Sequence, residues 1–286
     1  NEFQGIVDGA QVDFDKLFTY QSFDEFDSYL VAGNHFKKNE GHCTTTGVFG
    51  RENQANFLTH NNDLPSYHED AVTVLKIKNA NTDLVILQQT FAGQIGQNGV
   101  NNYGVAVGIN TIIDMPVSNK GIPVSFNVRK ILESKNITEA LAYLKKVDYG
   151  SSMNYLIADR EIAISVETWE DNFVVIDNNK QQYIAHTNHT LQENAPVLFE
   201  IDEDKNDGSF GYTYRRLNLA NDILGDSAND IDFEGLKELK STRPILNSAT
   251  IMGTIISIPK KGFPVLWTTP GSPNLFSHLK FTFDEK

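Results

Sequence analysis

Short apolar runs separated by polar turns fill most of the chain, and they predict a protein built largely of β-strands. Asn, Asp, Gly and Pro, the residues that favour turns, stand between the runs. We expect strands at Cys43–Phe49, Val72–Ile77, Leu84–Gln88, Val105–Ile109, Asn154–Ala158, Ile162–Glu167, Phe173–Asp177, Tyr183–His186, Thr250–Ile258 and Phe263–Thr268, with another starting at Phe57. The short turns between residues 154 and 186 predict an antiparallel meander.

Apolar residues spaced three, four or seven apart predict helices between these strands. The expected helices cover residues 23–30, 124–146, 214–224 and 233–239, and the second has a break near Asn136 with Thr138 as N-cap. This order of elements is typical of an α+β protein with antiparallel sheets and differs from the alternation that builds a parallel sheet. We expect two facing sheets flanked by helices, and the lack of a linker favours one domain.

Composition and charge exclude several classes of protein. The chain has 286 residues, of which 40% are hydrophobic and 21% charged, as in ordinary globular proteins. Its net charge of −13 argues against a nucleic-acid partner, because binding to phosphates needs a positive surface. No apolar stretch approaches the length of a membrane-spanning helix. Cys43 is the only cysteine, which excludes an intrachain disulfide and a zinc site of clustered cysteines.

Cys43 lies where a polar loop ends and a Thr-rich strand begins. A single cysteine is usually a small buried apolar residue, so its surroundings must decide whether it has a chemical role. A dense polar segment, Thr59–Leu64, follows further along the chain. A strand, a turn and a returning strand would bring Asp63 back beside Cys43, which makes Cys43 a candidate nucleophile.

These segments resemble those of the N-terminal-nucleophile cysteine hydrolases, and most closely the isopenicillin-N acyltransferase family, which is related to choloylglycine hydrolase and penicillin V acylase. The matching stretches, in chain order, are His42-Cys43-Thr44 with Asn61-Asn62-Asp63-Leu64, residues 98–106, residues 151–159 followed by Glu167, and residues 184–189. Two positions depart from the family pattern: His42 stands where the family usually has Gly, and Leu64 where it has Trp.

The resemblance implies a four-layer αββα sandwich of two mainly antiparallel sheets and an enzyme that cleaves its own chain. The cut between His42 and Cys43 would separate a pro-segment or small subunit, residues 1–42, from a catalytic domain, residues 43–286. Cys43 would then attack a linear amide or a thioester and form a thioacyl-enzyme. Release of the acyl group to water would make the protein an amidohydrolase, and release to an amine would make it an acyltransferase.

The chemistry of the residue types agrees with this scheme. The α-amine of a new chain end has a pKa of about 7.7–8.0 and can take the proton of its own thiol. Asp63 would hold that amine, and Asn61 belongs to the same matching segment. Side-chain amides are suitable uncharged donors for the developing oxyanion, and we expect Asn188 and Asn101 to supply them. The resemblance supports Asn188 more firmly, because an Asn-rich turn would also explain the segment around Asn101.

The same family often carries an arginine near the site, and Arg215 and Arg216 are the candidates here. If the expected strands pair so that their ends meet, aromatic and apolar side chains would line the substrate pocket and favour an apolar acyl group. The expected lining residues are Phe57, Leu64, Tyr67, Tyr103 and Phe126.

Two other interpretations account for the same residues. The first is a non-catalytic binding protein on the same scaffold, suggested by Leu64 in place of Trp. The second is an unprocessed Cys–His hydrolase with His186 or His189 as its base, while His60 and His68 are expected to be loop residues. His186 and His189 would also suit a metal pair, but no carboxylate stands beside them in the sequence, so we expect no metal and no cofactor.

The expected partner is a small-molecule acyl-amide or acyl-thioester substrate, and a homo-oligomer is left open. The chain begins at Asn1 rather than Met, so we expect either that a preceding segment has been removed or that the given sequence begins internally. The sequence leaves a cytoplasmic and a secreted or periplasmic location equally open.

Overall fold

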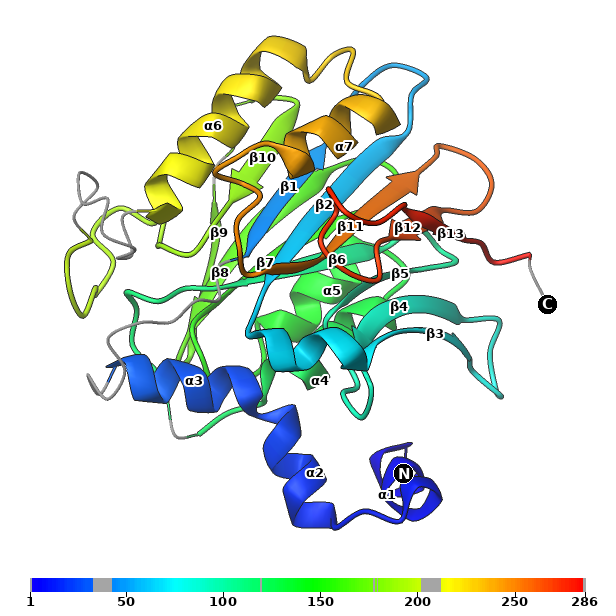
Figure 1. Ribbon diagram of the computed structural model, residues 1–286, viewed down its shortest axis with the longest axis vertical. Helices are drawn as coiled ribbons and strands as arrows, with labels where there is room; N and C mark the ends of the chain where they lie inside the picture. The colour runs from blue at the N-terminus through cyan, green and yellow to red at the C-terminus, as the bar shows by residue number, and fades with distance from the viewer. Residues whose placement is uncertain are drawn as a thin grey trace.

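Two antiparallel β-sheets face each other at the centre of the molecule (Figure 1). The computed structural model describes residues 2–32, 43–118, 120–176, 178, 180–201 and 212–284. The six-stranded sheet has the order β10-β1-β2-β11-β12-β13, and the seven-stranded sheet has the order β3-β4-β5-β6-β7-β8-β9.

The strands are short, as the apolar runs predict. Those of the six-stranded sheet are β1 (Thr44–Val48), β2 (Asn56–Asp63), β10 (Tyr183–His186), β11 (Thr250–Ile258), β12 (Val265–Thr268) and β13 (Leu279–Phe281). Those of the seven-stranded sheet are β3 (Val72–Lys78), β4 (Val85–Phe91), β5 (Asn98–Asn101), β6 (Ala106–Thr111), β7 (Met153–Ala158), β8 (Ala163–Trp169) and β9 (Asn172–Ile176).

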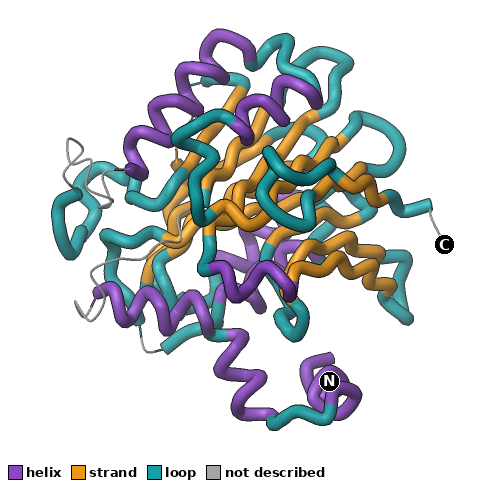
Figure 2. Tube along the Cα trace, viewed as in Figure 1, coloured by secondary structure: helices purple, strands orange, loops and turns teal. Residues whose placement is uncertain are grey.

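Helices cover the outer face of each sheet and complete a sandwich of four layers (Figure 2). The helices are α1 (Glu2–Ala10), α2 (Phe14–Gln21), α3 (Phe23–Ala32), α4 (Val124–Leu132), α5 (Ile137–Leu144), α6 (Tyr212–Ser227) and α7 (Phe233–Ser241), with a 3₁₀ helix, η1, at Ser66–Ala71. Helices α6 and α7 pack on the six-stranded sheet, and α4 and α5 pack on the seven-stranded sheet.

The alternation of side chains along the strands explains how one sequence supplies two cores. In β7, Tyr155 and Ile157 belong to the cluster that contains α4 and α5, whereas Leu156 and Ala158 belong to the cluster between the sheets. Successive residues of a strand point to opposite faces, so a strand covered on both sides must be apolar throughout. The predicted α+β class with antiparallel sheets is confirmed.

Several elements differ from the expectation. The break between α4 and α5 falls where predicted, but the N-cap of α5 is Asn136, whose side chain accepts a hydrogen bond from the backbone N–H of Glu139, and not Thr138. β5 forms in a segment that was expected to be a turn. Gly99 permits this, because a Cβ atom there would lie 2.5 Å from the carbonyl oxygen of Leu87 on β4.

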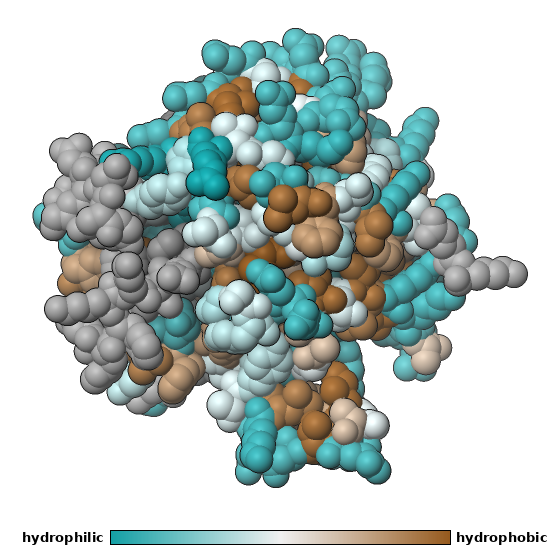
Figure 3. Space-filling view, viewed as in Figure 1, coloured by the Kyte–Doolittle hydropathy of each residue, from teal (hydrophilic) through white to brown (hydrophobic). Residues whose placement is uncertain are grey.

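Helices α1, α2 and α3 lie at one end of the sandwich, with the N-terminus beside them (Figure 1). Side-chain contacts tie them to the body of the protein, and Glu2 of α1 pairs with Arg129 of α4. The carboxylate of Glu25 accepts hydrogen bonds from the backbone of Val124 and the hydroxyl of Ser151, and the amide of Gln21 contacts the backbone of Gly93 and Ile95. Apolar side chains, among them Phe14 and Phe18, remain exposed on α1 and α2 (Figure 3).

In the part of the chain that the structure describes, no helix combines the length and apolar character needed to span a membrane.

Candidate active site

Cys43 and Asp63 lie side by side because β1 and β2 pair with Thr44 opposite Asn61. Cys43 comes directly before β1, and Asp63 is the last residue of β2. The backbone N–H of Asp63 donates a hydrogen bond to the Cys43 sulfur. Strand pairing therefore brings together the two residues that the sequence analysis placed next to each other.

The carboxylate of Asp63 is fully buried and is held on both oxygens. The hydroxyl of Thr250 donates to Oδ1 at 2.5 Å, and the amide of Asn247 donates to Oδ2 at 2.5 Å. Burial raises the pKa of Asp63 to about 7, against the opposing effect of the Arg216 charge. A carboxyl group with this pKa can both accept and release a proton near neutral pH.

Arg216, on α6, connects Cys43 with Asn188. Its guanidinium is fully buried and donates to the carbonyl oxygen of Cys43 at 2.5 Å, to the hydroxyl of Thr44 at 2.8 Å and to Oδ1 of Asn188 at 2.7 Å. Burial lowers the pKa of Arg216, while the nearby Asp63 and Cys43 act in the opposite direction. Arg215 lies next to it on α6 but is not among the residues that line the cavity at Cys43.

The side chain of Asn188 has a fixed orientation. Its Oδ1 accepts from Arg216, and its Nδ2 donates to the carbonyl oxygen of Thr111 at 2.9 Å. Its backbone N–H donates to the hydroxyl of Thr213 at 2.7 Å. Since an amide nitrogen carries two hydrogens, one N–H of Asn188 remains to serve a ligand.

Cys43, Asp63 and Asn188 line one small cavity of about 30 Å³. Residues of both sheets and of α3 enclose it, and the complete lining is Phe23, Asp24, Asp27, Cys43, Asp63, Leu64, Pro65, Gln97, Ile109, Thr111, Ile113 and Asn188. A cavity of this size has room for about one or two water molecules. The chain in this form is therefore closed to an acyl substrate, with α3 covering the cysteine.

Burial also favours the uncharged forms of the Cys43 thiol and of its neighbour Asp24. It raises the pKa of the Cys43 thiol to about 12, and the negative charge of Asp63 adds to this effect. It raises the pKa of Asp24 to about 8, with Glu25 and Asp27 contributing. In this form Cys43 is a neutral thiol at neutral pH, and a weak nucleophile, because the thiolate is the reactive species.

The structure places several expected site residues elsewhere. The amide of Asn101 donates to the carbonyl oxygens of Leu132 and Ser134 and its oxygen accepts from Gly104 and Val105, so Asn101 joins backbone segments and does not line the cavity. Asn61 likewise directs its amide to the carbonyl oxygens of Lys240 and Ile245.

Of the expected pocket residues, Leu64 lines the cavity and the others do not. Tyr67 is 68% exposed beside it, and the Tyr103 hydroxyl bonds to Asp83 at the end of a hairpin. Phe57 packs against the cluster under α6 and α7, and Phe126 lines a separate groove beside α1 and α2. His42, the residue before the expected cut, lies outside the described residues.

No histidine among the described residues lines the cavity, which argues against the Cys–His interpretation. His60 lies between the sheets, with its Nδ1 3.4 Å from the amide of Asn98, and His68 packs against aromatic rings that include Phe23. His186 pairs with Glu167, and His189 stacks on Tyr214. Within the described ranges there is also no group of three His, Cys, Asp or Glu side chains suited to a metal ion.

The sequence analysis did not identify Asn247, Thr250 or Asp24. Thr250 is the first residue of β11, and Asn247 lies just before the strand. Polar residues directly before an apolar strand could have indicated that these two side chains belong to a site. Asp24 had no local signal, because its position over Cys43 depends on how α3 docks on the sandwich.

A comparison with known families identifies the class of protein. The family model described as acyl-coenzyme A:6-aminopenicillanic acid acyl-transferase matches residues 50–207, more than half of the chain. The chain belongs to this family, which confirms both the resemblance and the expectation of an enzyme of the amidase and acyltransferase class. The matched region begins after Cys43 and ends before Arg216. The family match therefore gives no information on the roles of these two residues.

Solved structures with the same fold include three amide-cleaving enzymes. An N-acylethanolamine-hydrolyzing acid amidase ortholog from Caenorhabditis elegans has a TM-score of 0.58 and 17% identity, with 84% of this chain and 100% of that chain covered. A variant of conjugated bile acid hydrolase from Clostridium perfringens has a TM-score of 0.53 and 12% identity, with 84% and 93% covered. Penicillin V acylase from Agrobacterium tumefaciens has a TM-score of 0.53 and 11% identity, with 85% and 87% covered.

These similarities confirm the predicted αββα sandwich of the N-terminal-nucleophile hydrolases. No curated protein sequence matches the chain significantly.

We predict that Asp24→Asn stabilises the uncleaved chain at pH 8 and has no effect on its stability near pH 4. The folded chain keeps a proton on Asp24 up to about pH 8, whereas the unfolded chain loses it near 3.8. Stability therefore falls as the pH rises through this window, by about 1.4 kcal/mol for each unit of pKa difference, and asparagine removes that loss. Thermal unfolding from pH 4 to pH 8, in a Cys43→Ala background, measures the effect.

Asp148→Asn, which removes an exposed charge that does not line the cavity, is the control. An Asp24→Asn protein whose melting temperature follows pH in parallel with its parent would contradict the assignment of a buried, protonated Asp24.

Proposed function

We propose that the chain is the precursor of an N-terminal cysteine amidohydrolase or acyltransferase, and that Cys43 is its nucleophile. The observation that carries this proposal is the enclosure of Cys43, Asp63 and Asn188 in one cavity, with Arg216 bonded to both Cys43 and Asn188. Residues 1–42 are the pro-segment in this proposal, and residues 43–286 are the catalytic domain.

Self-cleavage starts with attack of the Cys43 sulfur on the carbonyl carbon of His42. A C–S bond forms, the C–N bond between His42 and Cys43 breaks, and the thiol proton ends on the new amine of Cys43. Asp63 is suited to carry this proton, since it is adjacent to the sulfur and has a pKa of about 7. Water then hydrolyses the thioester, which leaves a free carboxylate on His42 and a free thiol on Cys43.

The new chain end supplies its own base for turnover. The α-amine of Cys43 takes the thiol proton, and because the amine and the thiol belong to one residue their separation is fixed by covalent geometry. Asp63 stabilises the ammonium form by its charge. The thiolate attacks the substrate carbonyl, and the free N–H of Asn188 donates to the oxyanion, a contact worth about 2.7–4 kcal/mol.

The cavity walls favour an apolar acyl group. Leu64, Ile109 and Ile113 contribute apolar surface next to Cys43. Phe23, Asp24 and Asp27 of α3 occupy the space in front of them, so substrate entry requires that α3 moves once the chain has been cut. The acyl-enzyme is then resolved by water or by an amine.

We expect the purified wild-type protein to consist of two fragments, residues 1–42 and 43–286, because the thiol of Cys43 performs the cut. Cys43→Ala should remain a single chain of 32.0 kDa, since alanine has no nucleophile. Intact-mass spectrometry after incubation from pH 4 to pH 8 distinguishes the two forms. Thr46→Ala, which leaves the sulfur in place and removes a hydroxyl that bonds to Thr59 and not to Arg216, is the control that should still be cut.

A single uncut chain in the wild type at every pH would reject self-processing. Cleavage of Cys43→Ala at the same bond would reject Cys43 as the group that performs it.

Asn188→Ala should lower kcat for hydrolysis of N-acyl aminomethylcoumarins about 100–1000-fold, because the variant lacks the side-chain donor to the oxyanion. A series of acyl chains of increasing length supplies the substrate, and fluorescence follows the released amine. Asn101→Ala is the matched control, since its amide is engaged by backbone carbonyl groups and not by the cavity. Rates are expressed per cysteine titrated with iodoacetamide, so that loss of folded protein is not counted as loss of catalysis. Equal effects of the two substitutions would contradict the assignment of Asn188.

A further inference from the structure

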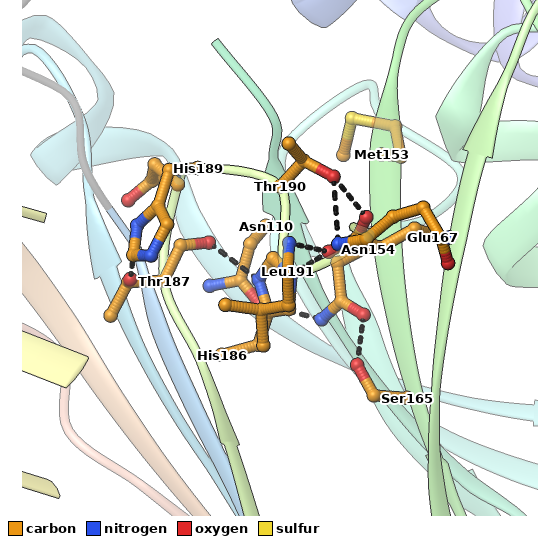
Figure 4. A network of polar contacts seen from close by, with 12 residues as sticks. Asn110, Met153, Asn154, Ser165, Glu167, His186, Thr187, His189, Thr190 and Leu191 are labelled. Atoms are coloured by element: carbon orange, nitrogen blue, oxygen red, sulfur yellow. Dashed lines mark hydrogen bonds and ion pairs between the residues drawn. The ribbon is translucent and has the colours of Figure 1, made fainter. Parts of the chain in front are cut away.

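Glu167 is a completely buried carboxylate that the proposed reaction does not use (Figure 4). It lies on β8 of the seven-stranded sheet, whereas Asn188 follows β10 of the six-stranded sheet. A buried charge is costly unless it is paired and hydrogen-bonded, so the partners of Glu167 indicate its purpose.

One carboxylate holds both sides of the turn that carries Asn188. Oε1 of Glu167 accepts from Nε2 of His186 at 2.8 Å and from the backbone N–H of Leu191 at 2.6 Å, and Oε2 accepts from the hydroxyl of Thr190 at 2.6 Å (Figure 4). His186 comes before Asn188, and Thr190 and Leu191 come after it. These bonds fix the entry and the exit of a turn whose central residue is the proposed oxyanion donor.

Hydrogen bonds hold both ring nitrogens of His186. Its Nδ1 lies 2.8 Å from the carbonyl oxygen of Thr187, and its Nε2 lies 2.8 Å from the carboxylate of Glu167. The carbonyl oxygen can only accept, so Nδ1 carries a hydrogen, and Nε2 and the carboxyl group share one hydrogen between them. Burial acts to raise the pKa of Glu167, but the hydrogen bond and charge of His186, with Thr190 and Leu191, outweigh it and lower the pKa. The two residues therefore form a buried hydrogen-bonded pair that links the two sheets.

Other polar groups complete the support of this turn. The carboxylate of Asp114 accepts from the backbone N–H of Thr190 at 3.1 Å, and the hydroxyl of Thr213 contacts Nδ1 of His189 at 3.0 Å. The Asn188 carbonyl accepts from the backbone N–H of Ile113. Thr213 also contacts both sides of Asn188, through Thr187 and His189, but it belongs to α6, whereas Glu167 reaches the turn from the opposite sheet.

We propose that Glu167 and His186 are positioning residues that hold the amide of Asn188 in the orientation needed to bind the oxyanion. This inference rests on the proposed function, in which Asn188 is the oxyanion donor. Neither residue touches the cavity at Cys43. Their effect passes through the turn, so they should influence reactions that form an oxyanion and leave other reactions of Cys43 unchanged.

Two reactions of the processed enzyme separate these effects. Acylation by 4-nitrophenyl acetate passes through a tetrahedral oxyanion and is measured as a burst of nitrophenolate. Alkylation of Cys43 by iodoacetamide forms no oxyanion and reports only on the thiolate. We expect Glu167→Ala to slow acylation about 10–100-fold, the usual range for loss of a group that orients a functional side chain. The rate of alkylation should stay within about two-fold of the wild-type rate. A two-fold change is small beside the ten-fold change that corresponds to 1.4 kcal/mol.

Conservative variants keep the test informative if Glu167→Ala folds poorly. Glu167→Gln retains an acceptor for His186 and Leu191 and should keep most of the acylation rate. Thr190→Val removes one of the three bonds and should slow acylation about five-fold, as expected for one lost hydrogen bond. Val166→Ala is the matched control, because Val166 lies on the same strand but packs with α4 and α5 on the opposite face.

Acylation of Glu167→Ala and Thr190→Val at the wild-type rate would overturn the inference while leaving the proposed function intact. A parallel fall of acylation and alkylation, or an equal fall in Val166→Ala, would show a merely structural role and would also overturn it. A wild-type enzyme whose Cys43 is alkylated but never acylated would instead reject the proposed function.

Discussion

The buried guanidinium of Arg216 is the interaction on which the proposed active site depends. It reaches from α6 to the carbonyl oxygen of Cys43, the hydroxyl of Thr44 and the amide oxygen of Asn188, and so joins three distant parts of the sequence, α6 included. A buried cation must be matched by acceptors, so these groups are held together by the cost of leaving the charge unpaired. The planar fork of an arginine can serve three acceptors in fixed directions, which a lysine cannot do.

Under the proposed function, the same cavity would keep the chain inactive until it is cut. Helix α3 covers Cys43, the remaining space is about 30 Å³, and burial keeps the thiol protonated. Cutting the chain before Cys43 changes two physical quantities together. It adds a positive charge next to Asp63, and it separates α3 from the strand that carries the nucleophile.

Local patterns in the sequence predicted most of the fold and the central pair of the site. Alternation and turn residues located the strands, and the pairing of β1 with β2 then placed Asp63 beside Cys43. Periodicity also contained an unused signal. The buried residues of α6 are spaced as one helical face, which includes Arg216 and excludes Arg215.

The remaining features depend on contacts that no local pattern contains. By its residue type, Asn101 was a plausible donor to the oxyanion. In the structure its amide instead donates to a carbonyl oxygen at the end of α4. Asn98, at the other end of β5, is the asparagine that contacts residues between the sheets. The cover formed by α3, and the link from Glu167 to His186 across the two sheets, arise only when distant segments pack together. Residue type and spacing identified candidates, and tertiary packing decided among them.

The central claim is that Cys43 becomes an N-terminal residue and carries the acyl group on its sulfur. The direct measurement is tandem mass spectrometry of tryptic peptides from wild-type protein that is quenched with acid during turnover of an N-acyl aminomethylcoumarin. We expect a peptide covering residues 43–51 with the acyl mass on Cys43, either on its sulfur or transferred from the sulfur to its α-amine during digestion. An intact peptide covering residues 39–51 in the active protein, or an acyl group on any other residue, would contradict it.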